Sequence, residues 1–237
     1  TELNQRKNLM LSIIIPCFNE VENFNYIFSS IEDICKKYNN IEFIIVENGS
    51  TDNSRNKIYS YINKKYNIKL ILIDKNRGYG FGVYQGLLKA NGDYVTWCHA
   101  DLQVNIEQIY TAFKLNFHNL RNQKVVIKGI RKNRVILDSI FTFFMSLICS
   151  LAYKQILRDI NSQPKIIEKK FIQKIKKNYP YDFNFDLFFL HTALKNNYRL
   201  INYPVIVQKR LAGLAKGGGS LKGKILLSLH TLRYIYK

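Results

Sequence analysis

The first half of the chain alternates short apolar runs with segments of helical periodicity. Four runs are rich in Ile, Val, Leu and aromatic residues and end at polar or turn-forming residues, which is typical of buried strands. These runs are residues 11–15, 41–46, 70–73 and 94–98. Three segments between them repeat apolar residues at helical spacing, namely residues 22–37, 54–66 and 82–90. This alternation predicts βαβ units and a mostly parallel sheet.

The second half is less regular, but it continues the alternation. The pattern predicts helices over residues 106–115, 136–157, 183–196 and 221–236, and strands over residues 125–127 and 199–207. Pro204 removes a backbone donor from the last strand, which places that strand at a sheet edge. Residues 165–177 alternate apolar and basic side chains. We therefore expect an α/β fold, with a Rossmann-like sheet flanked by helices and a basic helix at the C-terminus.

The apolar helix expected over residues 136–157 has two interpretations. It can be a core helix, or part of a face that docks on a lipid monolayer. Basic residues flank it, and others lie among Leu and Tyr in the last expected helix, which favours surface-lying amphipathic elements. These basic residues are Arg131, Lys132, Arg134, Lys154 and Arg158, then Lys222, Lys224 and Arg233.

The composition is that of a globular protein. The chain has 237 residues, of which 47% are hydrophobic and 22% charged. No window reaches the ~18 uncharged apolar residues of a membrane span, and no signal peptide is evident. The four cysteines form neither a zinc pattern nor a CxxC pair, so we expect a reduced, cytoplasmic protein.

The net charge of +19 is unevenly distributed. Residues 1–50 carry four Lys or Arg against seven Asp or Glu, whereas residues 201–237 carry seven basic residues and no acidic one. Such an excess favours anionic partners, namely phosphates, an acidic membrane surface or nucleic acid.

Polar residues gather where the first four strands end. The segments are residues 16–20, 47–52, 74–78 and 99–103. Ligands of open parallel sheets bind beyond the carboxyl ends of the strands. The sequence therefore predicts a polar, partly acidic crevice at this edge of the sheet.

Five segments together resemble the family 2 glycosyltransferases of the GT-A fold, especially the polyprenyl-phosphate sugar synthases. They are residues 12–20 (SIIIPCFNE), 42–52 (EFIIVENGSTD), 76–80 (NRGYG), 99–103 (HADLQ) and, more weakly, 210–216 (RLAGLAK). Each is weak alone, but their order and spacing match the family's. The resemblance implies a GT-A-like domain over residues 1–216, with a nucleotide-binding half over about 9–103 and an acceptor half over about 104–216. Residues 217–237 would form a hinge and the basic helix.

The resemblance also implies a set of residues that bind the nucleotide sugar. Loop residues after the first strand, the polar pair that closes the second strand, the glycine-containing loop after the third and two late cations all match family positions. These are Pro16, Phe18, Glu20, Glu47, Asn48, Asn76, Gly78, Arg210 and Lys216. The family usually has two Asp where this chain has Glu47 and Asn48, and one of the two binds the base. The two cations would clamp the diphosphate; the alternative is a solvated basic loop.

The segment 99–103 stands where the family binds a divalent cation through Asp-x-Asp. His99 replaces the first Asp, Asp101 is retained as the second, and Gln103 follows. Oxygen ligands suit Mg²⁺ or Mn²⁺, and the imidazole of His99 favours Mn²⁺. The replacement leaves metal binding open, because His99 can instead be a strand-end histidine that only makes a hydrogen bond.

An inverting enzyme with a hydroxyl acceptor needs a general base, and Asp186 and Asp182 are the candidates. A phosphate acceptor is already a nucleophile, in which case Asp186 only binds or orients. Asp182 has the alternative of capping the helix that follows it. By the resemblance, residues 159–165 (DINSQPK) stand where the family has an acceptor-side loop, and Lys165 at the end of this segment is a candidate phosphate contact.

The function that the resemblance implies is metal-dependent, inverting transfer of a sugar from a nucleotide donor. The acceptor is a polyprenyl phosphate or a cell-surface glycan, at the inner face of an anionic membrane. Two alternatives stay open. One is a degenerate relative that binds nucleotide sugar without turnover. The other is a basic nucleic-acid-binding protein, which leaves the strand-end motifs unexplained.

Overall fold

A computed structural model describes residues 9–62, 66–133, 135–175, 178–210, 212 and 220–236. Its centre is one seven-stranded sheet with the order β3-β2-β1-β4-β6-β5-β7. The strands are β1 (Leu11–Cys17), β2 (Ile41–Asn48), β3 (Ile68–Ile73), β4 (Tyr94–Trp97), β5 (Val125–Lys132), β6 (Lys165–Glu168) and β7 (Arg199–Ile206). Only β6 runs antiparallel to its neighbours, β4 and β5, among the described pairings. The expected α/β class and the edge position of the last strand are confirmed.

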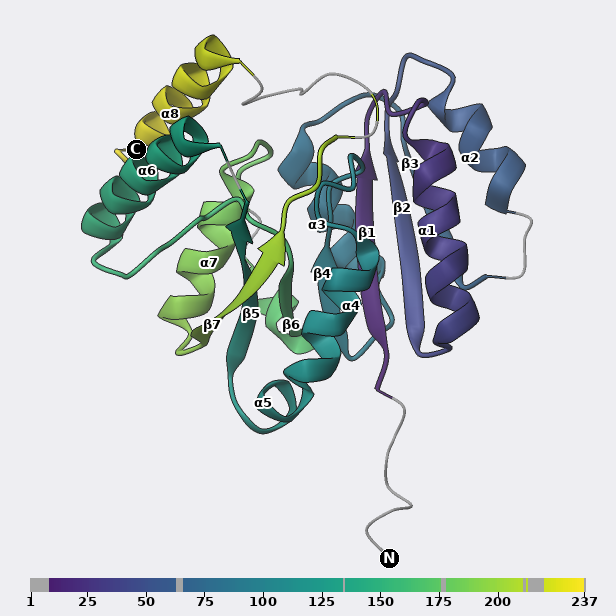
Figure 1. The fold of residues 1–237 in the computed structure, drawn as a ribbon, viewed down its shortest axis with the longest axis horizontal. Coiled ribbons are helices and arrows are strands. Elements are labelled where there is room, and N and C mark those ends of the chain that lie inside the picture. Colours follow the sequence, from purple (N-terminus) through teal and green to yellow (C-terminus); the bar gives the residue numbers. More distant parts are fainter. Residues whose placement is uncertain are drawn as a thin grey trace, which may run out of the picture.

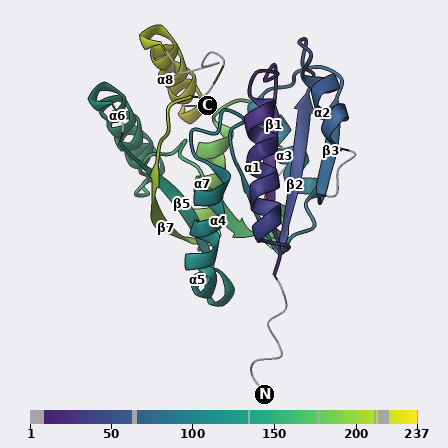
Figure 2. The same cartoon turned by 45° about the vertical axis from the view of Figure 1, so that its right-hand side comes forward.

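Helices cover both faces of this sheet, as Figures 1 and 2 show. The helices are α1 (Phe24–Lys37), α2 (Ser54–Ile62), α3 (Tyr79–Lys89), α4 (Ile106–Leu115), α5 (Phe117–Asn122), α6 (Ile136–Tyr153), α7 (Phe185–Lys195) and α8 (Leu221–Ile235), with a 3₁₀ helix over Lys169–Lys174. Because parallel strands need crossover helices, this arrangement follows from the alternation in the sequence.

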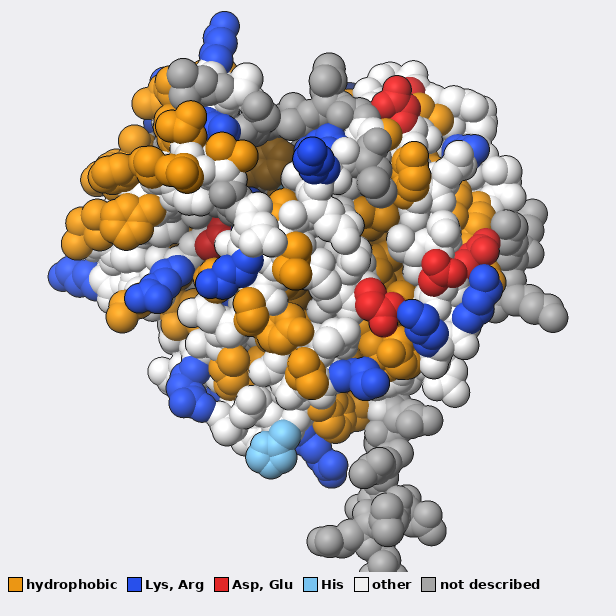
Figure 3. Space-filling model, viewed as in Figure 1, with side chains coloured by type: hydrophobic (Ala, Val, Ile, Leu, Met, Phe, Trp, Pro, Cys, Tyr) orange, Lys and Arg blue, Asp and Glu red, His pale blue; other side chains and the backbone are white. Residues whose placement is uncertain are grey.

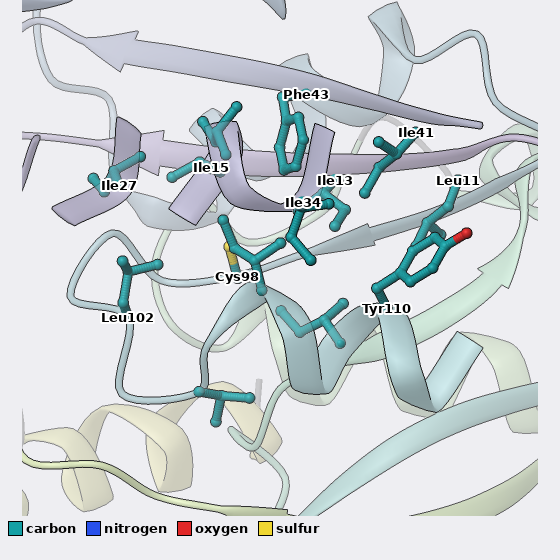
Figure 4. Packing of buried hydrophobic residues seen from close by; sticks show 14 of the residues in the cluster. Leu11, Ile13, Ile15, Ile27, Ile34, Ile41, Phe43, Cys98, Leu102 and Tyr110 are labelled. Carbon is teal, nitrogen blue, oxygen red and sulfur yellow. The ribbon is translucent and has the colours of Figure 1, made fainter. Parts of the chain in front are cut away.

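The core has two parts, one on each side of the sheet. Ile13 and Ile15 of β1 pack with α1, α2 and α4, whereas Ile14 between them packs with α3, α7 and the 3₁₀ helix. Figure 4 shows the first of these clusters, in which Ile27 and Phe43 lie near Ile15. Side chains alternate across a strand, so a central strand buried on both faces is apolar at nearly every position. The polar exception in β1 is Ser12, whose hydroxyl donates to the carboxylate of Glu42.

Several boundaries differ from the sequence prediction because tertiary pairing decides them. β5 extends to Lys132 because it pairs along its whole length with β7. The segment 165–177 divides into β6 and the 3₁₀ helix. α3 begins at Tyr79, three residues before the predicted start. The sequence pattern did not predict α5. Of the helix expected over residues 54–66, α2 covers residues 54–62, and residues 63–65 lie outside the described residues.

α6 is not a core helix, so that interpretation was wrong. Ser146 and Cys149 are the buried residues of α6, whereas Ile136 is 77% and Leu151 is 71% exposed. α6 and α8 lie side by side in both views, and Lys224 of α8 forms an ion pair with Asp138 of α6 (Figures 1 and 2). By length and composition, α6 is apolar enough to cross a membrane. The sequence analysis had required about 18 uncharged apolar residues, and it therefore passed over this 18-residue helix, which contains Asp138.

The expected division at residues 217–219 lies outside the described residues. The two expected halves share the continuous sheet, since β4 of the first half pairs with β6 of the second.

Candidate functional site

A cavity of about 950 Å³ opens at the carboxyl ends of β1, β2 and β4. All five motif segments contribute to its walls. The predicted residues that line it are Pro16, Phe18, Glu20, Asn48, Asn76, Gly78, His99, Asp101, Gln103 and Arg210. Lys216, also predicted here, lies outside the described residues.

The loop after β1 is held by the loop after β2. The backbone N–H of Asn19 donates to Ser50 Oγ at 3.0 Å, and the N–H of Glu20 donates to Ser54 Oγ at 2.9 Å. Asn19 adopts a φ of 51°, which Asn tolerates better than most residues. This turn carries Phe18 and Glu20 to the cavity wall.

Asn48 fastens the glycine-containing loop to the end of β2. Its amide donates to Asn76 Oδ1 at 3.2 Å and to the carbonyl of Gly78 at 3.0 Å. Gly78 has a φ of 99°, and a Cβ there would lie 2.3 Å from the carbonyl oxygen of Tyr181. Only glycine fits this position, so the loop approaches the cavity with its backbone.

Glu47 is not part of the cavity wall. Its side chain is fully buried and accepts two hydrogen bonds from Arg55, at 2.8 and 2.6 Å, and one from the backbone of Ser50 at 2.5 Å. In this conformation Glu47 is engaged in holding the β2 end and α2 together. Asn48 is the residue of the pair that the structure places at the cavity.

Asp101 also lines the cavity, in a tight turn after β4. One oxygen, Oδ1, accepts from the backbone N–H of Gln103 at 3.1 Å, and the other, Oδ2, lies 2.8 Å from Nη2 of Arg210. Leu102, which lies between Asp101 and Gln103, has a φ of 51°. This conformation is strained for a residue with a branched side chain. This strained turn aims Asp101 and Gln103 into the cavity.

His99 belongs to a network of aromatic and amide groups, of which Tyr79 and Gln163 line the cavity with it. Its ring stacks on Tyr79, with 5.3 Å between ring centroids, and its Nε2 lies 3.4 Å from the amide of Gln163. The indole N–H of Trp97 donates to the hydroxyl of Tyr79 at 2.9 Å. Burial lowers the pKa of His99, which favours the neutral imidazole despite the nearby Asp101. The sequence analysis did not name Gln163 as a site residue. In the structure, the peptide bond from Gln163 to Pro164 is cis.

The donor set fits a cation that takes only part of its coordination from the protein. Among the described residues, no group of three or more His, Cys, Asp or Glu could enclose a metal ion. Mg²⁺-type sites use one or two carboxylates and complete their coordination with substrate phosphates and water. The carboxylate of Asp101, beside Gln103, meets that requirement.

Asp186 and Lys165 lie behind the cavity rather than in its wall. Lys165 Nζ lies 2.9 Å from Asp186 Oδ1, and both side chains are fully buried. The expectation that Lys165 contacts a phosphate was therefore wrong. The ammonium of Lys165 is paired with Asp186 and donates to the carbonyl of Ser162. The structure likewise does not bring Asp186, the candidate base, to the acceptor side. Asp182 does line the cavity. It accepts from the backbone N–H of Asn184, but Asn184 is itself the N-cap residue of α7, so Asp182 does not cap that helix.

The cavity continues between α6 and α8, where its character changes. Apolar and hydroxyl side chains of both helices form this part, including Phe141, Met145, Leu227 and Thr231. Arg131 at the end of β5 also lines it. Three side-chain hydrogen bonds hold it to Asp159, from Nε at 2.9 and 3.1 Å and from Nη2 at 2.5 Å. Burial would raise the pKa of Asp159, but Arg131 outweighs burial and lowers it, so this pair is ionised.

Comparison with known proteins supports the predicted resemblance. The model of Glycosyl transferase family 2 matches residues 12–123. A dolichol-phosphate mannosyltransferase of Pyrococcus furiosus is 26% identical over 97% of this chain and 63% of that protein. A dolichyl-phosphate beta-glucosyltransferase of Dictyostelium discoideum is 28% identical over 57% of this chain and 44% of that protein. The chain thus spans less than two thirds of these relatives.

Solved structures share the fold. Glucosyl-3-phosphoglycerate synthase of Mycobacterium tuberculosis, crystallised with phosphoglyceric acid, superposes with a TM-score of 0.70 at 13% identity, over 96% of this chain and 79% of that one. The same enzyme crystallised with Mn²⁺, uridine diphosphate and glucosyl-3-phosphoglycerate gives a TM-score of 0.68 at 14% identity, over 96% and 80%. The GT-A-like fold is confirmed, and residues 12–123 carry the sequence pattern of the family 2 glycosyltransferases.

Proposed function

We propose that this protein is a glycosyltransferase that moves a sugar from a nucleoside diphosphate sugar to a polyprenyl phosphate at a membrane surface. The observation that carries the proposal is that five separated motif segments line one cavity, from Pro16 in the first to Arg210 in the last. That cavity lies where open α/β sheets bind nucleotides.

The polar part of the cavity suits the donor. Asn48 and Asn76 offer hydrogen-bonding groups, and Arg210 offers a cation that can grip a diphosphate. Asp101, with Gln103 and His99 beside it, would hold a Mn²⁺ or Mg²⁺ ion, which neutralises charge on the leaving diphosphate when bound. The imidazole of His99 favours Mn²⁺ over Mg²⁺.

The part between α6 and α8 suits a lipid acceptor. Phe141, Met145 and Leu227 would contact an apolar chain, whereas a glycan would need polar partners along its length. Arg131 and Lys224 also line the cavity, although each is paired with a carboxylate, Asp159 and Asp138 respectively. Unlike the fully buried Lys165, both reach the cavity, where a phosphate headgroup could share them with those carboxylates. The names of the two dolichol-phosphate relatives point to the same acceptor class.

The chemistry follows from this acceptor. An oxygen of the acceptor phosphate attacks the anomeric carbon of the sugar, and the bond from that carbon to the diphosphate breaks, so the nucleoside diphosphate leaves. A single displacement inverts the anomeric configuration. No proton has to be removed from the phosphate, which agrees with the burial of Asp186 away from the cavity.

The exposed face of α6 supports attachment to an anionic membrane surface. Its exposed apolar residues, Ile136, Leu137, Ile140, Phe143, Phe144, Leu147 and Leu151, form one strip, and Figure 3 shows hydrophobic side chains gathered over α6 and α8 with Lys and Arg at the border. A contiguous apolar patch bordered by cations is typical of proteins that lie on anionic lipid.

The donor half of the proposal is tested by thermal shift. UDP, GDP, CDP, CMP and dTDP are each added with Mn²⁺, Mg²⁺ or EDTA. A ligand at about 100 times its Kd adds ~2.7 kcal/mol of stability, which is readily measured. We expect one nucleotide to stabilise the protein only when a cation is present. In Asp101→Asn, addition of the cation should no longer increase the stabilisation by that nucleotide. If no nucleotide raises the melting temperature, the donor site is wrong.

The acceptor half is tested by transfer from the stabilising nucleotide's sugar conjugates. A short polyprenyl phosphate in anionic vesicles is compared with soluble oligosaccharides, and the anomeric configuration of the product is determined by NMR. Transfer to the lipid phosphate with inversion supports the proposal. Transfer to oligosaccharides alone contradicts it, and nucleotide binding without any turnover indicates a degenerate, non-catalytic relative.

A further inference from the structure

Asp101, which we propose as the cation's carboxylate, is already paired with a cation of the chain itself. Its Oδ2 lies 2.8 Å from Nη2 of Arg210, and its Oδ1 accepts from the backbone of Gln103. Both carboxylate oxygens are therefore engaged. An incoming metal ion must displace the guanidinium or share Asp101 with it.

The backbone holds this ion pair in place. The N–H of Gln208 donates to the carbonyl of Gln103 at 2.8 Å, so the segment after β7 is joined to the turn after β4 two residues from each partner. The side chains of Arg210 and Asp101 are only 23% and 10% exposed. Water and salt screen such a pair much less than an exposed surface pair.

We infer that Arg210 competes with the divalent cation for Asp101, and thereby makes cation binding depend on the donor diphosphate. In the protein without donor, the guanidinium neutralises Asp101 and weakens its attraction for a metal ion. A diphosphate offers Arg210 other anionic oxygens, which it can bind in a bidentate manner. Arg210 then turns from Asp101 to the diphosphate, and Asp101 becomes available to the cation.

This inference rests on the proposed function and extends it to the order of binding. Because binding energies are reciprocal, a nucleotide that frees Asp101 must raise cation affinity by the factor by which the cation raises nucleotide affinity. The pair therefore disfavours loading of the site by metal alone.

The test is a titration with Mn²⁺ alone, in which free Mn²⁺ is measured by electron paramagnetic resonance. We expect Arg210→Ala to bind Mn²⁺ about tenfold more tightly than the wild type, equivalent to ~1.4 kcal/mol. Arg210→Lys keeps a competing cation. Lys209→Ala removes a neighbouring charge for which the structure gives no pairing with Asp101. Lys209→Ala should stay within about twofold of wild type, as expected for an exposed charge. Arg210→Lys should bind Mn²⁺ less tightly than Arg210→Ala, because a cation still faces Asp101. Equal or weaker Mn²⁺ binding by Arg210→Ala overturns the inference.

Asp101→Asn separates failure of this inference from failure of the proposed function. If Asp101→Asn abolishes Mn²⁺ binding but Arg210→Ala does not tighten it, the cation site is correct and only the competition is wrong. If Asp101→Asn leaves Mn²⁺ affinity unchanged, Asp101 is not the cation ligand. In that case the cation site of the proposed function and the competition by Arg210 are both wrong. A cooperative thermal transition in each variant verifies that the fold is intact.

Discussion

The ammonium of Lys165 lies 2.9 Å from the carboxylate of Asp186, and neither side chain has any exposed surface. Lys165 stands opposite Lys128 in the register of β6 and β5, and Lys128 is buried as completely. Two buried lysines on neighbouring strands are costly unless each is compensated. Asp186 compensates one, and the carbonyls of Gly129 and Asp159 accept from the other.

Lys165→Met should destabilise the protein, because it leaves the carboxylate of Asp186 buried without its cation. Breaking one partner of a buried pair costs about 3–5 kcal/mol, whereas replacing both with apolar residues is often neutral. Urea unfolding should therefore show a large loss for Lys165→Met and recovery in Lys165→Met/Asp186→Leu. If the single variant is as stable as wild type, the ion pair between Lys165 and Asp186 does not contribute to stability.

Asp182→Asn should leave transfer to a lipid phosphate nearly intact. Asp182 is the candidate base that lines the cavity, and asparagine keeps the oxygen that accepts from Asn184. Loss of a general base costs about 10²–10⁴ in rate. We expect kcat to fall by less than about tenfold, because a phosphate needs no base. A loss of 10² or more on a phosphate acceptor would contradict this chemistry and assign Asp182 a proton-transfer role.

Lys128 should make stability rise with pH above neutrality. Burial first, and then the charge of Lys165, lower the pKa of Lys128 from 10.5 to about 7. Below pH 7 the lysine is charged in both states, and burying that charge opposes folding. Between pH 7 and 10.5 the unfolded chain holds a proton that the folded one has released, so stability increases. The charged groups that act on it are Lys165, Asp159, Arg131 and Asp186.

The measurement is urea unfolding of wild type and Lys128→Met at several pH values from 6 to 10. Other groups titrate in this range, so the informative quantity is the difference between the two proteins. We expect Lys128→Met to lose stability relative to wild type as the pH rises. A difference that is constant with pH would show that Lys128 has an ordinary pKa in the folded protein.

Leu151→Glu should weaken binding to anionic vesicles far more than Leu115→Glu. The two leucines are equally exposed, at 71% and 70%, but Leu151 lies on α6 and Leu115 on α4. Burying a leucine contributes ~1.5–3 kcal/mol, so loss of Leu151 from the lipid face should weaken co-sedimentation at least about tenfold. Binding of the wild type should also weaken with salt. Equal effects of the two substitutions would place the lipid face elsewhere.

Much of the cavity could be predicted because its residues follow strands. Pro16, Asn48 and Asp101 each lie just beyond an apolar run, and parallel strands bring their carboxyl ends to one edge. Glu47 shows the limit of this reasoning. It precedes Asn48 by one residue, so its side chain points to the other face, where Arg55 binds it.

Lys165 and Asp186 show a second limit. Both are ionisable residues in a segment that the family resemblance assigns to the acceptor side, and the sequence could suggest only that they face a ligand. Whether such a group meets a ligand or another side chain depends on residues 21 positions away in the chain and on the direction of β6.

The sequence by itself determined the alternation of strands and helices, the edge position of β7 and the polar strand ends, because these depend on local periodicity and on backbone donors. Only the tertiary structure decided which polar groups reach the cavity. It joined Arg210 to Asp101 across 109 positions, buried Lys165 against Asp186, and left the apolar side of α6 without a covering element among the described residues. Pairing and burial of this kind depend on contacts between distant segments, which no local pattern records.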